Sequence, residues 1–243
     1  MRLGAMAVHE TSRQGFGRVA ESYDRSRPGY PDEAIAWLVE EIGLDAGRTV
    51  ADLAAGTGKL TASQAATGAE VIAVEPVAKM LEVLRDRVPA ADVREGTAEA
   101  TGLPDASVDA VTVAQAFHWF DGPAALAEID RILRPSGRLA LVWNVRDLDH
   151  PTQRAVEDLL APHRGATPSH RSGGWRAAFE GPAPFRSAER RTFPNVVMLD
   201  ADALAERIES TSFIASLPAA DRAATREHVR ELTVGLPDRF PFP

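Results

Sequence analysis

The stretch DLAAGTGK, residues 52–59, contains the residue types that hold a nucleotide or a nucleoside. The acid Asp52 ends a short apolar run, and Gly56 and Gly58 follow it with one residue between them. A glycine has no side chain, so the backbone of such a loop can approach phosphate, ribose or amino-acid groups closely. The chemistry expected here is the binding of a nucleotide-like cofactor, and three kinds of loop compete to explain it.

An ATP-binding loop explains the stretch poorly. That loop follows the pattern G-x-x-x-x-G-K-[ST], because its glycines and its lysine cradle the phosphates. Gly58 and Lys59 match the pattern, but Leu53 stands at its first position and Leu60 at its last. The sequence therefore departs from the ATP-binding pattern at two of its four fixed positions.

A dinucleotide-binding loop explains the stretch better, but not completely. Its pattern is G-x-G-x-x-G, with alanine allowed at the last position, and Gly56 and Gly58 supply the first two glycines. Thr61 occupies the third position, where the close contact between helix and strand favours a smaller residue. An NAD(P)-dependent oxidoreductase is therefore kept as an alternative, although the chain has no Tyr-x-x-x-Lys pair.

A third loop matches at every position except one. The run VADLAAGTGKLT resembles the first motif of class I S-adenosylmethionine-dependent methyltransferases, D-x-G-x-G-x-G, with Asp52, Ala54, Gly56 and Gly58 at the four positions. Ala54 replaces the first glycine, which is a conservative change if the backbone dihedral angles there are ordinary. The resemblance implies a cofactor whose amino-acid moiety and ribose lie against the loop, with an acid near its ammonium group. A plain turn between strand and helix would use the same glycines.

An acid at the end of the next apolar segment supports a ribose. Glu75, followed by Pro76, ends the run AEVIAVE, and a carboxylate there can accept hydrogen bonds from both ribose hydroxyls. Enzymes that use NAD share this acid, so Glu75 indicates a ribose without identifying the cofactor.

Two further segments carry the methyltransferase resemblance in the expected order. EGTAEATGLPDASVDAV, residues 95–111, resembles the loop after the third strand of the family, which implies that Thr97, Ala98 and Glu99 border the adenine. LRPSGRLALV, residues 133–142, resembles the turn into the fifth strand. The resemblance covers about residues 15–145.

Two shorter segments narrow the resemblance. YDRSRPGYP (23–31) and AQAFHWF (114–120) are similar to the small-molecule branch called type 11, near the trans-aconitate methyltransferases. There the N-terminal segment folds over the cofactor as a lid, which implies that Tyr23, Arg27 and Tyr30 close the site and meet the methionine carboxylate or an acidic substrate. Arg27 would equally pair with a surface acid, a contact that contributes little.

The acceptor side of the site is expected around His118, just past the fourth apolar segment. A hydroxyl, amine or carbon acceptor benefits from a base, whereas a carboxylate acceptor needs none. His118 is therefore a candidate catalytic base, a candidate ligand for a substrate carboxylate, or a histidine bonded to nearby backbone. Gln115 is expected to face the cofactor. The acceptor pocket is expected to include Trp119, Trp143, Asn144 and Trp175, and ordinary packing explains each of these equally well.

Alternating strands and helices must position these residues. Strands are expected at residues 48–54, 69–75, 91–96, 107–116 and 137–143, with amphipathic helices before, between and after them. This alternation predicts an α/β fold: a doubly wound, mostly parallel, Rossmann-like sheet of six or seven strands with helices on both faces. In such a sheet the ligand lies at the carboxyl ends of the strands, where the strand order reverses.

The rest of the chain is expected to elaborate a single methyltransferase domain over residues 1–243, with a cofactor-binding core at 15–145 and a helical substrate-side elaboration at 146–243. Within the elaboration, helices are expected at 151–163, 174–180, 201–210 and 219–234, and a strand at 185–193. The final RFPFP is too interrupted by proline for a central strand. Without a last strand the sheet keeps an open edge, which predicts a strand-exchanged homodimer.

Composition limits the class of protein. A net charge of −8 over 243 residues argues against a nucleic-acid binder, and the absence of cysteine excludes disulfides and thiolate chemistry. No apolar run has the length of a membrane span, so a cytoplasmic protein without membrane contact is expected. His150, His163 and His170 lack metal-ligand spacing with nearby acids, so no metal is expected.

The hypothesis that fits best is a methyltransferase that uses S-adenosyl-L-methionine as its cofactor. It would move a methyl group to a carboxylate, hydroxyl, amine or carbon atom of a small molecule. The alternatives are the NAD(P)-dependent oxidoreductase and a cofactor-binding protein without activity.

Overall fold

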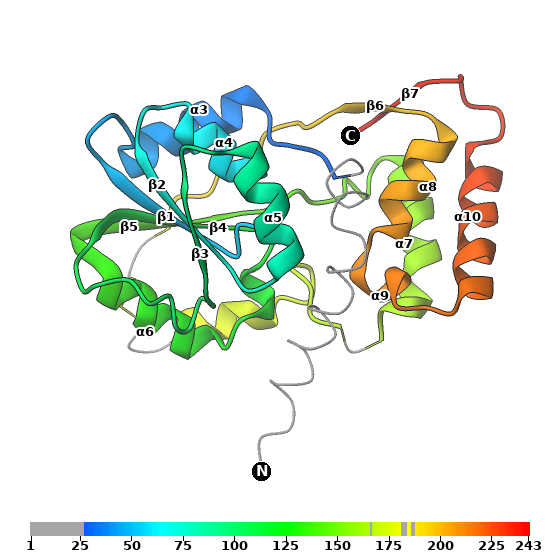
Figure 1. Ribbon diagram of the computed structural model, residues 1–243. Helices are drawn as coiled ribbons and strands as arrows, with labels where there is room; N and C mark the ends of the chain where they lie inside the picture. Colours follow the sequence, from blue (N-terminus) through cyan, green and yellow to red (C-terminus); the bar gives the residue numbers. More distant parts are fainter. Residues whose placement is uncertain (1–26, 166, 181–183, 186–187) are drawn as a thin grey trace, which may run out of the picture. The chain divides into compact units, whose positions relative to one another are not determined.

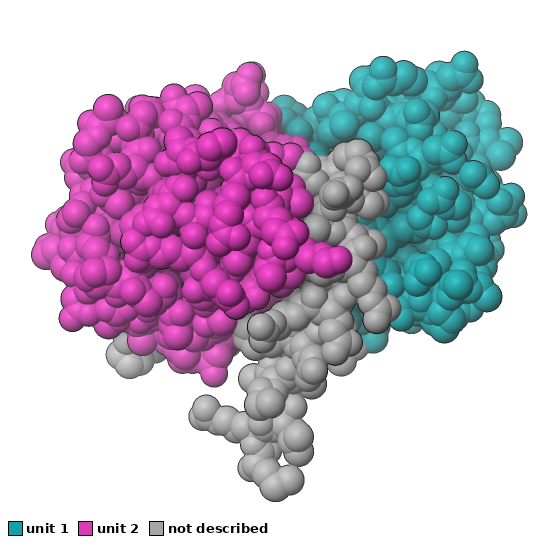
Figure 2. All heavy atoms as spheres, in the orientation of Figure 1, with its two compact units in different colours: residues 1–28, 144–167, 194–243 teal, residues 29–143, 168–193 magenta. Residues whose placement is uncertain are grey.

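The computed structural model describes residues 27–165, 167–180, 184–185 and 188–243 (Figure 1). They form two compact units (Figure 2). Each unit has its own hydrophobic core. The sheet unit comprises residues 29–143 and 168–193, and the helical unit comprises residues 1–28, 144–167 and 194–243. The boundary between Trp143 of the sheet unit and Asn144 of the helical unit falls close to the boundary expected at residue 145. Residues 168–193 were expected in the helical elaboration but belong to the sheet unit.

The sheet unit is built on five parallel strands in the order β3-β2-β1-β4-β5. The strands are β1 (Thr49–Leu53), β2 (Glu70–Glu75), β3 (Asp92–Glu95), β4 (Val108–Ala114) and β5 (Leu133–Val142). The chain winds outward from β1 to β3 and then returns to place β4 on the other side of β1. The doubly wound parallel fold is confirmed, but the expected count of six or seven strands is wrong for this sheet among the described residues.

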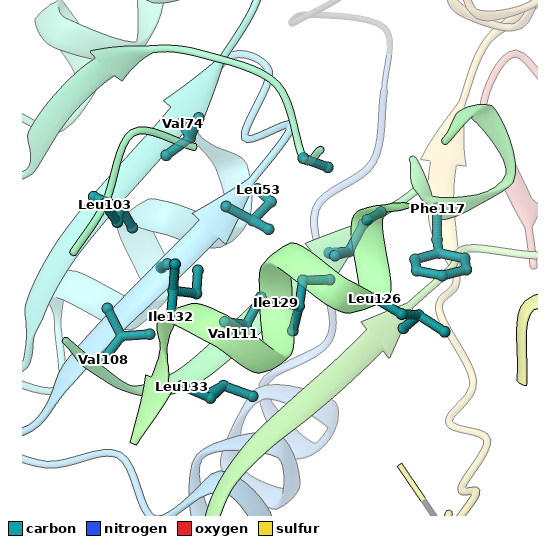
Figure 3. Close-up of a cluster of buried hydrophobic side chains, with 14 residues drawn as sticks. Leu53, Val74, Leu103, Val108, Val111, Phe117, Leu126, Ile129, Ile132 and Leu133 are labelled. Atoms are coloured by element: carbon teal, nitrogen blue, oxygen red, sulfur yellow. The ribbon is translucent and has the colours of Figure 1, made fainter. Parts of the chain in front are cut away.

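Helices cover both faces of the sheet because the central strands are apolar on both faces. The helices of this unit are α3 (Asp32–Ile42), α4 (Lys59–Ala65), α5 (Ala78–Arg87) and α6 (Gly122–Ile132), with the 3-10 helices η1 (Phe117–Trp119) and η2 (Gly174–Phe179). Leu38 of α3 and Leu60 of α4 share a buried cluster with Val50 of β1. On the other face, Leu126 and Ile129 of α6 pack with strand residues such as Leu53 and Val111 (Figure 3).

The helical unit has a separate core. Its elements are α7 (Pro151–Arg164), α8 (Ala201–Glu209), α9 (Ser212–Ala215) and α10 (Ala219–Thr233), and the antiparallel pair β6 (Val197–Leu199) and β7 (Phe240–Phe242). Leu160 of α7, Leu204 of α8, Val229 of α10 and Phe242 of β7 are buried together. The proline-interrupted C-terminal segment therefore does form a short strand, but it pairs with β6 and not with the five-stranded sheet.

The strand expected over residues 185–193 is wrong. Residue 185 and residues 188–193, the described part of that segment, contain no strand. The segment has large apolar side chains only at its ends, Phe185 and Phe193, so it offers no alternating apolar face to bury.

The loop after β1 corrects a second expectation. Ala54 has φ of 53°, in the left-handed region, so its dihedral angles are not ordinary. An L-residue with a Cβ pays about 1–2 kcal/mol for this conformation, whereas glycine adopts it freely. Gln115, at the end of neighbouring β4, has φ of 61° and carries the same kind of strain. Strain of this kind at a residue other than glycine persists only where the surrounding structure fixes the backbone.

Replacing Ala54 by glycine is expected to stabilise the fold. The release of left-handed strain, less the extra entropy that glycine gives the unfolded chain, leaves a gain of about 0.5–1 kcal/mol in the free energy of unfolding. Urea denaturation of Ala54→Gly would measure it. Ala55→Gly is the matched control, because Ala55 is not in the left-handed region and glycine there should destabilise. Equal losses in both variants would show that Ala54 is unstrained.

Candidate functional site

The carboxyl edge of the sheet brings together the segments that carry the candidate cofactor residues. Leu53 of β1 pairs with Val74 of β2 on one side and with Val113 of β4 on the other. The loops that follow β1 and β4, and the acid that ends β2, therefore meet at one edge. The strand order reverses between β1 and β4, which is where a sheet of this kind binds its ligand.

Asp52 of β1 is hydrogen-bonded to residues of α4 and β4. Its side chain is buried, and its two oxygens accept hydrogen bonds from the hydroxyl groups of Thr61, at 2.6 Å, and Thr112, at 2.9 Å. Gln64 donates to the Thr112 hydroxyl at 2.8 Å, so α4 and β4 are both connected to β1. Burial raises the pKa of Asp52 to about 6, although the two hydroxyls oppose the shift. The expected contact between Asp52 and the ammonium group of a cofactor stays a prediction.

Glu75 connects the end of β2 to the glycine loop. One carboxylate oxygen accepts from the backbone N–H of Gly56 and the other from that of Val77, each at 3.0 Å. Burial raises the pKa of Glu75 to about 7, and the charge of Asp52 adds to the increase. Each oxygen of a carboxylate has a further lone pair, so Glu75 can also accept a pair of ribose hydroxyls. Pro76 follows directly and leads into α5.

The two loop glycines have different roles. Gly58 has φ of 80°, and a Cβ there would lie 3.0 Å from Cγ of Leu84, so only glycine allows α5 to pack against the loop. Gly56 has φ of 60°, and a Cβ there would meet nothing within 4 Å. Gly56 therefore presents bare backbone to open space. Gln115 follows β4, the strand next to β1, and its Nε2 is buried without a hydrogen-bond partner among the described residues. A bound ligand could supply that partner.

The loop after β3 is held between β2 and α6. Thr97 and Ala100 exchange backbone hydrogen bonds, which makes a tight turn, and Ala98 is buried. Glu99 accepts a hydrogen bond from the backbone N–H of Asp121, at 3.0 Å, next to the start of α6. A Cβ at Gly96, before the turn, would lie 3.0 Å from Cγ1 of Val74, which is closer than most Cβ contacts in proteins. The residues expected to border the adenine thus form a firmly held loop beside the carboxyl edge.

Four rings, His118, Trp143, His170 and Trp175, form an aromatic cluster in the sheet unit. The centroid of the Trp143 ring lies 4.6 Å from that of His170 and 4.7 Å from that of Trp175. Trp143 Nε1 donates to Nδ1 of His118 at 3.4 Å. Trp119 lies next to His118, with ring centroids 5.2 Å apart. Three of the residues expected around the acceptor are therefore brought into contact with one another, and Trp119 adjoins them.

The aromatic cluster keeps His118 neutral. Burial, with a contribution from His170, lowers the pKa of His118 to about 4. Because Nδ1 accepts from Trp143, the proton of the neutral ring lies on Nε2, which can donate a hydrogen bond. Sequence reasoning considered His170 only as a metal ligand, and no local pattern indicates its contact with Trp143.

Four expected site residues remain, and the structure describes three of them. Arg27, in the helical unit, donates to the carbonyl of Ser210 at 3.3 Å and to the hydroxyl of Thr211 at 3.4 Å, so its partner is not a surface acid in these contacts. Tyr30 packs against the core beside α3. The remaining two are Asn144, which accepts from the side chain of Asn195 at 2.9 Å in the helical unit, and Tyr23, which lies outside the described residues.

The described ranges lack two kinds of feature. They contain no group of three or more His, Asp or Glu side chains arranged to hold a metal ion. None of their helices combines the length and the apolar character of a membrane-spanning segment. The expectation of no metal is not tested by this and stays a prediction.

Comparison with known proteins identifies the chemistry of the family. Residues 51–141, which include the glycine loop, Glu75 and His118, match the family model described as a methyltransferase domain. The chain is 41% identical over 217 residues to an uncharacterized methyltransferase of Mycobacterium tuberculosis, which covers 89% of this chain and 84% of that protein. It is 37% identical over 216 residues to an uncharacterized methyltransferase-like protein of Schizosaccharomyces pombe, with 88% and 84% covered.

Solved structures agree with the sequence relatives. A protein of Anaeromyxobacter dehalogenans, named as a type II methyltransferase, superposes with a TM-score of 0.60 at 27% identity over 89% of this chain and 92% of that one. The YcgJ protein of Bacillus subtilis, at 22% identity and a TM-score of 0.55, shares the fold. These likenesses replace the oxidoreductase alternative. The chain belongs to the class I S-adenosylmethionine-dependent methyltransferases.

Proposed function

We propose that this methyltransferase acts on a small organic molecule and binds both its cofactor and its acceptor at the carboxyl edge of the sheet unit. The observation that carries the proposal is Glu75, a buried carboxylate that ends β2 and accepts the backbone N–H of Gly56. A ribose diol bound by Glu75 would place the rest of a nucleoside along the bare backbone of Gly56, where a side chain would otherwise stand.

The residues around Glu75 suit the parts of S-adenosylmethionine. Glu75 and Pro76 would hold the ribose, and the turn formed by Thr97, Ala98 and Glu99 would border the adenine. The loop from Asp52 to Gly58, which includes Ala54 and Gly56, would lie against the amino-acid moiety, and Gln115 Nε2 would find there the acceptor that it lacks among the described residues. When bound, the cofactor supplies an activated methyl group on its sulfonium. The protein then mainly has to align the acceptor and exclude water.

His118 is proposed to hold the acceptor by donating a hydrogen bond. A histidine with a pKa of about 4 is a weak base, and its Nδ1 already accepts from Trp143. Its Nε2–H is suited to an oxygen atom of the acceptor. Trp119, Trp143 and Trp175 would supply the apolar walls around that oxygen and shield the sulfonium from water.

Several finer assignments complete the proposal. The segments around Arg27 and His118 resemble the trans-aconitate methyltransferase-like branch, and Tyr23, Arg27 and Tyr30 would form its lid. We also propose that the two units act as one methyltransferase domain, with Asn144 on the substrate side. A homodimer and a cytoplasmic location, both expected from the sequence, stay predictions.

Labelled-methyl transfer tests the proposed function. The protein is incubated with methyl-labelled S-adenosylmethionine and a small-molecule extract of its host, and the labelled product is identified by mass spectrometry. We expect a labelled product of low molecular mass. Calorimetry with S-adenosylmethionine, its demethylated product and NAD runs in parallel. If S-adenosylmethionine binds but no metabolite is methylated, a cofactor-binding protein without activity is favoured. If NAD binds and S-adenosylmethionine does not, the assignment of S-adenosylmethionine as the cofactor is wrong.

Cofactor affinity is expected to rise with pH because of Glu75. Its pKa is raised to about 7, and only the ionised carboxylate accepts both ribose hydroxyls, so binding must release a proton near neutral pH. Between pH 6 and 8 the affinity for the demethylated cofactor should increase about tenfold. In the free protein the slope is opposite, since a raised folded-state pKa contributes stability that is lost as pH rises from about 4.5 to about 7.

Calorimetry in buffers of different ionisation enthalpy measures this proton release. Glu75→Gln should abolish it, and Glu75→Ala should weaken binding by about 1–3 kcal/mol. Glu82→Gln, an exposed change on α5, is the control and should behave as the unaltered protein. Proton release that persists in Glu75→Gln would assign it to another group.

Substitutions of His118 distinguish a role as a hydrogen-bond donor from a role as a catalytic base. Glutamine carries an amide N–H about as far from Cα as histidine Nε2 but has no basic nitrogen, so His118→Gln should retain most of the methyl transfer. His118→Ala loses the donor and should be about tenfold to a hundredfold slower, the value of one hydrogen bond to a polar or charged partner. The pH profile of transfer should show no ionisation between the pKa of Glu75 and pH 9. Equal inactivity of the two variants would instead support a base.

A further inference from the structure

The connection between β3 and β4 crosses the sheet unit without a helix. A crossover between parallel strands is usually helical, and a helix satisfies its own backbone hydrogen bonds. Residues 96–107 contain turns and irregular chain but no helix. The backbone groups of this crossover therefore need partners from elsewhere in the fold, and α6 supplies several of them.

One carboxylate of α6 holds the middle of the crossover. Glu128 Oε1 accepts hydrogen bonds from the backbone N–H of Thr101, at 2.9 Å, and from its hydroxyl group, at 2.6 Å. The oxygen of the same hydroxyl accepts from the backbone N–H of Leu103 at 3.2 Å. Thr101 is 3% exposed and the side chain of Glu128 is 12% exposed, so these hydrogen bonds are largely withdrawn from water.

Arg131, three residues further along α6, completes the attachment. Its Nε donates to Glu128 Oε2 and its Nη2 to Glu128 Oε1, each at 2.8 Å, and Nη2 also donates to the carbonyl oxygen of Leu103 at 2.8 Å. The hydrogen bonds from Arg131 lower the pKa of Glu128 to about 2 although burial opposes them, and those from Thr101 lower it further. Glu128 is therefore ionised at neutral pH, where charge-assisted hydrogen bonds are stronger than neutral ones.

The turn at residues 97–100 is thus attached to α6 on both sides. Within the turn, Glu99 accepts from the backbone N–H of Asp121, directly before α6. Directly after the turn, Thr101 is bonded as described above. The Leu103 side chain then enters the buried cluster that α6 shares with the strands (Figure 3). These contacts fix the turn through the protein's own side chains.

We propose that Glu128 and Arg131 are positioning residues for the cofactor. They hold the turn at residues 97–100 in the shape that receives the adenine, and they act through Thr101 and Leu103. This inference rests on the proposed function, which assigns the adenine to that turn. A turn that is already ordered loses little conformational freedom when a ligand binds, so its affinity for the ligand is higher.

The test uses two substitutions that loosen the turn and nearly preserve side-chain size. Glu128→Gln removes the charge that pairs with Arg131, and Thr101→Val replaces the hydroxyl by a methyl group. Thr101→Ser is the conservative variant, because it keeps the hydroxyl. Calorimetry on the full chain measures the affinities for the demethylated cofactor and for adenosine. Hydrogen exchange of the backbone amides in residues 97–103 measures how well the turn is ordered.

Asp109 provides a matched control in the same unit. It accepts a backbone N–H, from Thr49 at 2.9 Å, and it pairs with two arginines, Arg48 and Arg134. Its side chain is 13% exposed, against 12% for Glu128. Asp109 lies at the start of β4, so it is at the edge of the sheet opposite to the carboxyl ends. Asp109→Asn should therefore lower the unfolding temperature as Glu128→Gln does, but leave both affinities unchanged.

We expect Glu128→Gln and Thr101→Val to bind the cofactor and adenosine about tenfold more weakly, each ligand by the same factor. Thr101→Ser should bind like the unaltered protein. Exchange in residues 97–103 should be faster in the two weakened variants and should slow when either ligand is bound. Unchanged affinities at a lower unfolding temperature would show that the network is only structural, and so would an equal loss of affinity in Asp109→Asn. Either result would overturn the proposal.

Hydrogen exchange also separates this proposal from the proposed function. If the unaltered protein binds adenosine without slower exchange in residues 97–103, the adenine lies elsewhere. The assignment of the turn in the proposed function is then wrong, and the positioning role falls with it. If exchange does slow but Glu128→Gln and Thr101→Val keep their affinities, only the positioning role is wrong.

Discussion

The glycine loop depends on two buried carboxylates that the sheet holds side by side. Asp52 is the next-to-last residue of β1 and Glu75 is the last residue of β2, and between them they accept hydrogen bonds from two hydroxyl groups and two backbone N–H groups. Burial removes water from each carboxylate and raises its pKa, and the hydrogen bonds that each accepts from the loop partly offset this effect. Thr61, whose size counts against a dinucleotide loop, is needed here as the partner of Asp52.

The same loop stores backbone strain. Ala54, Gly56 and Gly58 all have positive φ, and so does Gln115 across the reversal of the strand order. Strain at an alanine and a glutamine persists only where the surroundings fix the chain, and here the strand pairs and Glu75 fix it. The consequence is a bare stretch of backbone at Gly56 with a buried donor, Gln115, at the neighbouring strand end.

The two units treat their buried polar groups differently. In the sheet unit the aromatic cluster desolvates His118 and keeps it neutral, which suits our proposal of a hydrogen-bond donor rather than a base. In the helical unit Glu157 pairs with both Arg146 and Arg164, so opposite charges accompany one another where they are withdrawn from water.

Much of this protein follows from local pattern. The alternation of apolar segments and amphipathic helices located all five strands of the main sheet, and the spacing of Asp52, Gly56, Gly58 and Glu75 indicated the cofactor edge, because parallel strands bring their carboxyl ends together. The sequence by itself thus determined the fold class and the cofactor. Only the tertiary structure decided the left-handed backbone at Ala54, the tautomer of His118, and the contact of His170 with Trp143. Those features arise from contacts between segments distant in the chain, and no periodicity or spacing records which side chains such contacts deprive of water.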